Sequence, residues 1–269
     1  MSSPTSQPRT SHLYHAGSRE AFPALAAIGL TFASVATMFV LIVIATMVRL
    51  DLTIAVAIGQ VGLVAVPVIA MAATGRDRRV LGLARPRLRF VVAAMLVGAS
   101  AWFVNMAIVS QLPFDTSDTR SLRVLLDEPS LWLVLACIAV APAVCEEILF
   151  RGVLMRGLGS RLHAWVAVIA SALMFSLYHM NPIQMIPTLV LGLLFGAIAT
   201  RGGSAIPTML AHALNNAIAL LVARGDLPGL IAKDHSGLLD RYPIVAVVVA
   251  GGATAGGLAL ALTGSGHDE

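Results

Sequence analysis

Long runs without a single charged residue constrain this chain more than any other feature of its sequence. They cover residues 21–48, 52–75, 90–114, 162–200, 202–223 and 242–267. Because about 20 apolar residues cross a bilayer, most of these runs hold one transmembrane helix each. The run over 162–200 is long enough for two, with a break at the turn-forming dipeptide Asn181-Pro182. With 58% hydrophobic and 12% charged residues, the chain lies outside the composition of soluble globular proteins.

A further apolar segment, 130–150, carries two glutamates near its end and completes the set of spans. The sequence therefore predicts an all-α, polytopic membrane helix bundle of about eight transmembrane helices. The expected spans are 22–48, 52–74, 90–111, 130–150, 163–180, 182–200, 204–223 and 243–263. Residues 1–20, which are polar and rich in Ser, Thr and Pro, are expected to form a disordered cytoplasmic tail, and residues 21–265 a single domain.

Orientation follows from the basic residues, which are enriched in the cytoplasmic loops of membrane proteins. With the N-terminus in the cytoplasm, the segments on that side carry twelve arginines, against six basic residues on the other side. We therefore expect an integral, multi-pass protein of a bacterial cell (inner) membrane with both termini cytoplasmic. The net charge of +4 then reflects membrane topology, and the expected partner is the lipid bilayer, with no nucleic acid.

Two adjacent glutamates, Glu146 and Glu147, lie in one of the most apolar stretches of the chain. A buried carboxylate costs several kcal/mol unless it is protonated, paired or in contact with water. Arg151 follows Glu147 by one helical turn, so these two can pair, whereas Glu146 points roughly 100° away. We expect Arg151 to neutralise Glu147, and Glu146 to face a buried polar cavity near a kink at Pro142. A simple ion pair that stabilises the bundle is the alternative.

Two later motifs add polar residues to neighbouring spans. Phe175-x-x-x-His179 lies near the end of the fifth span, and His212-x-x-x-Asn216 lies on one face of the seventh. The first two spans lack such residues, so the motif-bearing core is expected over 130–220. Each motif alone is typical of structural hydrogen bonding between membrane helices. Glutamate, two histidines and an amide together supply a hydrolytic site, in which a buried glutamate deprotonates water and the other groups orient it or stabilise an oxyanion. The same Glu and His set could alternatively hold a divalent metal such as zinc.

These three motifs, in this order and each in a hydrophobic span, resemble the CPBP family of intramembrane proteases. That family includes the type II CAAX prenyl endopeptidases and bacteriocin-processing or self-immunity proteins, and the resemblance covers about residues 130–220. It implies that Glu146 activates water with His179, and that His212 and Asn216 stabilise the oxyanion. Glu147 and Arg151 would hold the site in shape. The family is often labelled metalloprotease, although a glutamate mechanism without metal has been argued; a metal, if present, would be held by Glu146, His179 and His212.

The resemblance predicts an endopeptidase that cleaves a membrane-embedded or lipid-modified peptide or protein, with a prenylated CAAX motif as the family's best-known target. The chain contains no His-Glu-x-x-His motif of the usual zinc proteases. Two other functions stay open: a non-enzymatic membrane adaptor or immunity protein on the same scaffold, and a small-solute or proton-coupled transporter. The oligomeric state is open as well, because Gly192-x-x-x-Gly196 can join helices between chains or within one.

Overall fold

The computed structural model describes residues 21–109, 111, 130–226, 241 and 243–263, and in these residues it contains helices and no strand. The all-helical membrane bundle predicted from the sequence is confirmed. Seven helices are long and apolar enough to cross a membrane, and an eighth is shorter. They are α1 (Ala24–Met47), α2 (Leu52–Ala73), α3 (Leu88–Val109), the continuous helix Leu131–Gly159, α8 (Ala164–Tyr178), α9 (Pro182–Gly202), α10 (Ile206–Arg224) and α12 (Pro243–Thr263).

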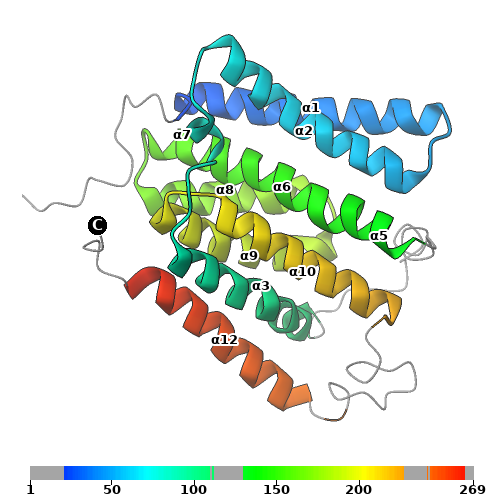
Figure 1. Cartoon of the computed structure of the whole chain (residues 1–269), viewed down its shortest axis with the longest axis vertical. Coiled ribbons are helices and arrows are strands. Elements are labelled where there is room, and N and C mark those ends of the chain that lie inside the picture. The colour runs from blue at the N-terminus through cyan, green and yellow to red at the C-terminus, as the bar shows by residue number, and fades with distance from the viewer. Residues whose placement is uncertain (1–20, 110, 112–129, 227–240, 242, 264–269) are drawn as a thin grey trace, which may run out of the picture.

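The helices pack side by side (Figure 1). The pair α1 and α2 covers one side of the bundle, and α3 and α12 cover the opposite side. The helix Leu131–Gly159 and α10 lie between these pairs, together with α8 and α9. Helix α1 begins and α12 ends at the same end of the bundle, which is what eight crossings require.

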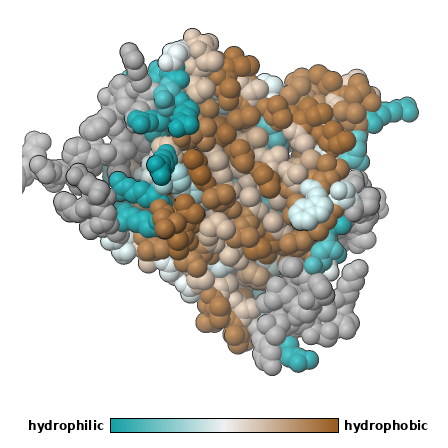
Figure 2. All heavy atoms as spheres, in the orientation of Figure 1, coloured by the Kyte–Doolittle hydropathy of each residue, from teal (hydrophilic) through white to brown (hydrophobic). Residues whose placement is uncertain are grey.

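The outer surface is apolar over the length of the helices. Large hydrophobic side chains such as Leu25, Phe32, Ile244 and Val248 are more than half exposed on α1 and α12. Figure 2 shows a hydrophobic belt across the visible face, with hydrophilic residues gathered towards the two ends of the bundle. An apolar belt of this kind is compatible with lipid and not with water. The chain is therefore an integral, multi-pass membrane protein.

The fourth span extends beyond its predicted end at residue 150. It runs from Leu131 to Gly159 because Arg151 and Arg156, which were expected outside the membrane, are buried. The Arg156 guanidinium donates a hydrogen bond to the Gly203 carbonyl at 3.2 Å. Both arginines are accommodated inside the bundle and do not end the helix. The glutamate pair consequently lies near the middle of the span and not near its end.

This helix is irregular on both sides of the glutamates. It consists of α5 (Leu131–Val134), η2 (Leu135–Val140), α6 (Ala141–Glu147), η3 (Ile148–Met155) and α7 (Arg156–Gly159), and both η2 and η3 have π-helical geometry. Pro142 follows the first π segment directly, where it lacks the N–H that a regular helix would use. Segments of π-helix are frequent at functional sites.

Helix α8 is too short to cross the apolar core fully. Its 15 residues span about 22 Å, against roughly 30 Å for the hydrocarbon core. The chain then reverses at Met180 and Asn181, as the sequence predicts, and the Asn181 side chain accepts a hydrogen bond from the Ile183 N–H at 3.0 Å. His179 follows the last residue of α8 and caps its C-terminal end.

Glycines let the helices around the site approach closely. A Cβ added at Gly98 of α3 would lie 2.4 Å from the Ala211 carbonyl oxygen of α10, next to His212. The two glycines of the Gly192-x-x-x-Gly196 motif face Ala172 and Val168 of α8 in the same close manner. This motif therefore joins two helices of one chain.

Candidate active site

Glu147 is fully buried and has three polar partners. Its Oε1 forms an ion pair with Arg151 Nη1 at 2.7 Å, as the helical spacing predicts. Two further partners come from α10: His212 Nδ1 lies 3.1 Å from Oε1, and the Thr208 hydroxyl donates to Oε2 at 2.7 Å. With this set of partners, Glu147 is held as a structural carboxylate.

Arg151 is closed off by aromatic rings on the side away from Glu147. Its guanidinium carbon lies 4.4 Å from the centre of the Phe175 ring and 5.8 Å from that of Phe195. Only 2% of this large side chain is exposed. Cation–π contact therefore adds to the ion pair and fixes the Glu147–Arg151 unit between α8 and α9.

Glu146 has fewer partners, although it is also buried. Its Oε1 lies 3.5 Å from the Tyr178 hydroxyl, and its Oε2 lies 3.9 Å from His212 Nε2. Among the residues that the structure describes, none makes a hydrogen bond to Oε2. One carboxylate oxygen thus faces a histidine nitrogen at a distance that a single bridging water fits.

His212 connects the two carboxylates. Because an ionised carboxylate only accepts hydrogen bonds, the proton between His212 and Glu147 belongs to Nδ1. Nε2 then faces Glu146, as an acceptor when the ring carries one proton and as a donor when it carries two. Glu147 therefore sets the orientation of the histidine, and that histidine presents its other nitrogen to Glu146.

His179 lies in the same cluster without touching the carboxylates. Its Nδ1 donates to the Phe175 carbonyl oxygen at 2.8 Å, which leaves Nε2 available for a reactant. The Phe175 ring stands edge-on to both imidazoles, with centroid distances of 4.9 Å to His179 and 5.8 Å to His212. The structure, which describes both residues, shows no hydrogen bond or ion pair between His179 and Glu146.

The two asparagines of α10 differ in burial. Asn216 is half-buried, one turn beyond His212, whereas Asn215 is 5% exposed and its Oδ1 has no hydrogen-bond partner among the described residues. Asn216 is not brought into direct contact with either glutamate. Its partial exposure leaves it accessible to a bound molecule.

A metal site does not fit this arrangement. Within the described part of the chain, no three His, Cys, Asp or Glu side chains are grouped so that they could hold a metal ion. Catalytic zinc usually takes three protein ligands and one water.

Comparison with known proteins finds one similarity. Residues 128–218 match the family model described as type II CAAX prenyl endopeptidase, Rce1-like. This segment is therefore similar to Rce1-like endopeptidases. No curated protein and no solved structure matches the chain. The Rce1-like segment contains all three motifs and coincides closely with the core expected over 130–220.

Three residues at the site were not predicted from the sequence. Thr208 is one turn before His212 on the same helix face, so its spacing was the available signal. Tyr178 is next to His179 in the chain. Gln60 of α2 is 5% exposed and is a neighbour of the Tyr178 hydroxyl. The expectation that the first two spans lack polar residues was therefore wrong, and Gln60 lies outside the Rce1-like segment.

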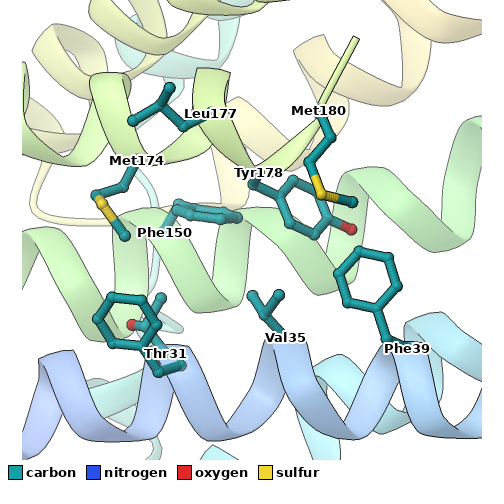
Figure 3. A pocket seen from close by; sticks show the side chains of 9 residues that line it. Thr31, Val35, Phe39, Phe150, Met174, Leu177, Tyr178 and Met180 are labelled. Atoms are coloured by element: carbon teal, nitrogen blue, oxygen red, sulfur yellow. The ribbon is translucent and has the colours of Figure 1, made fainter.

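An apolar groove leads to this cluster from the side of the bundle. It encloses about 360 Å³ between α1, η3 and α8 (Figure 3). Its lining residues are Thr31, Phe32, Val35, Phe39, Phe150, Met174, Leu177, Tyr178 and Met180. Tyr178 belongs to both features, since its ring lines the groove and its hydroxyl approaches Glu146.

Proposed function

We propose that this protein is an intramembrane endopeptidase that hydrolyses a peptide bond with a water activated by Glu146. The observation that carries the proposal is the environment of Glu146. It is a buried carboxylate at the middle of a membrane helix, with Oε2 3.9 Å from a histidine nitrogen whose ring is oriented by a second carboxylate. The Rce1-like segment supports the same class of reaction.

The first step is the activation of water. A water about 2.8 Å from both atoms bridges Glu146 Oε2 and His212 Nε2. Glu146 takes one proton from this water as the hydroxide forms a bond to the carbonyl carbon of the peptide. The electron pair of the carbonyl moves to its oxygen, which becomes an oxyanion.

The second step is the collapse of the tetrahedral intermediate. Asn216 donates a hydrogen bond to the oxyanion through its amide group, and His212 donates a second one when its Nε2 carries a proton, in keeping with their position on one face of α10. When the carbon–nitrogen bond breaks, the amine needs a proton, and Glu146 returns the one that it took. His179 orients the water or delivers that proton through Nε2.

The proposed substrate is a membrane-associated peptide or protein. The groove between α1 and α8 is lined almost entirely by apolar side chains, so it favours a chain that approaches through lipid. Rce1-like proteins as a family include prenyl endopeptidases, which makes a prenylated CAAX peptide the first substrate to test. No step of the proposed mechanism uses a metal, because the described His, Cys, Asp and Glu side chains form no group of three that could hold one.

The proposed orientation places both termini in the cytoplasm of a bacterial cell. The basic segment that begins at Arg76 and Arg201 at the end of α9 lie at the end of the bundle where α1 begins and α12 ends. A concentration of arginines at one end is typical of the cytoplasmic side.

A comparison of membrane proteomes tests the function. Cells that produce the wild-type protein, the Glu146→Gln variant or the Asp226→Asn variant are compared for protein fragments. Asp226 is a matched control, because it is an acid at the end of α10 that pairs with Arg224 far from the motifs in sequence. We expect a fragment that is present with wild type and Asp226→Asn and lost with Glu146→Gln. Identical fragments in all three would overturn the proposal.

A further inference from the structure

The hydroxyl of Tyr178 is the meeting point of three helices. It lies 3.5 Å from Glu146 Oε1 on α6 and 3.0 Å from Met38 Sδ on α1. The side chain of Gln60 on α2 is a further neighbour. A tyrosine hydroxyl has one proton to donate and lone pairs to accept. The direction of that one proton therefore depends on its neighbours.

The hydroxyl proton has two neighbouring acceptors, Met38 Sδ and Glu146 Oε1. They differ greatly in strength. A thioether sulfur accepts hydrogen bonds weakly, whereas an ionised carboxylate forms charge-assisted bonds about twice as strong as neutral ones. Glu146 therefore attracts the proton although Met38 is nearer in this structure. The aromatic ring is already fixed, with Phe150 at 5.4 Å and His179 at 5.1 Å between ring centroids.

We propose that Tyr178 is a positioning residue for Glu146. The hydroxyl holds Oε1 of Glu146, so that Oε2 stays turned towards His212 and the reacting water. This inference rests on the proposed function, because it assigns a role in the same reaction.

Kinetics on a farnesylated CAAX peptide, with purified full-length protein, test this role. Tyr178→Phe keeps the ring and removes the hydroxyl; we expect kcat to fall about ten- to a hundredfold with KM unchanged. Thr37→Val is the matched control, since it removes a hydroxyl of α1 that lies outside the groove lining and bonds to the Ala33 carbonyl.

Met38→Leu distinguishes two roles of the Tyr178 hydroxyl: positioning Glu146, or linking α8 to α1. This substitution conserves volume and removes the competing acceptor, so we expect kcat to equal or exceed that of wild type. If the hydroxyl served to tie α8 to α1, Met38→Leu would lower kcat as Tyr178→Phe does, and that result would overturn the proposal. So would a wild-type kcat in Tyr178→Phe beside an inactive Glu146→Gln, whereas full activity in Glu146→Gln would overturn the proposed function itself.

Discussion

The two glutamates of α6 are neighbours in the chain and opposites in their surroundings. Glu147 is bonded by Arg151, His212 and Thr208, all within 3.1 Å. Glu146 has one hydroxyl at 3.5 Å and one histidine nitrogen at 3.9 Å. The comparison teaches that burial alone does not distinguish a structural charge from a reactive one. The number of satisfied acceptor positions does, because an unsatisfied carboxylate oxygen can still bind a water or a substrate.

The largest effect on stability is expected on the Glu147 side. Glu147→Gln leaves the Arg151 guanidinium buried without a counter-charge, which costs about 3–5 kcal/mol. Unfolding of the purified protein in detergent, followed by helical circular dichroism, measures this loss. Glu146→Gln serves as the comparison and should unfold like wild type. Equal destabilisation by both substitutions would contradict the difference between the two glutamates.

A second substitution acts on α10, the helix whose His212 contacts both glutamates. Gly98→Val introduces a side chain where even a Cβ would lie 2.4 Å from the Ala211 carbonyl, one residue before His212. Overpacking of this kind costs typically 1–3 kcal/mol, and it should also displace His212 and lower the cleavage rate. Gly29→Ala, at a position with no atom within 4 Å of the added Cβ, is the control and should leave both measurements unchanged.

A smaller change compares two partners of Glu147, the Thr208 hydroxyl and Arg151. Thr208→Val removes the hydroxyl that donates to Glu147 Oε2 and keeps the shape of the side chain. A hydrogen bond to a charged group contributes about 1.5–3 kcal/mol, so the loss should be smaller than that of Glu147→Gln. Chemical unfolding of the two variants shows which of them loses more free energy of unfolding. The reverse order would mean that Arg151 is not the main partner of Glu147.

Metal removal should have no effect. The described residues contain no group of three metal-binding side chains, so exhaustive chelation is expected to leave the cleavage rate unchanged. The assay compares chelated enzyme with enzyme to which zinc has been returned. A rate that disappears on chelation and returns with zinc would contradict the proposed mechanism.

The sequence alone predicted the helices well, because charge-free runs and a turn dipeptide mark where a membrane chain can enter and leave the bilayer. The end of the fourth span was misplaced because Arg151 and Arg156 look exposed in sequence but are buried inside the bundle. The pairing of Glu147 with Arg151 followed from helical spacing. The contacts of His212 with both glutamates depend on how α10 packs against α6, which no local pattern encodes. Gln60 is far from the motifs in sequence and only the fold brings it to Tyr178.

The central claim is that Glu146 is the base that activates water while Glu147 is structural. The most direct measurement is the cleavage rate of purified Glu146→Gln, together with its unfolding temperature, on the substrate identified from membranes. The account predicts a rate about 10²- to 10⁴-fold below wild type in a protein that unfolds at the wild-type temperature. A wild-type rate in that variant would contradict it.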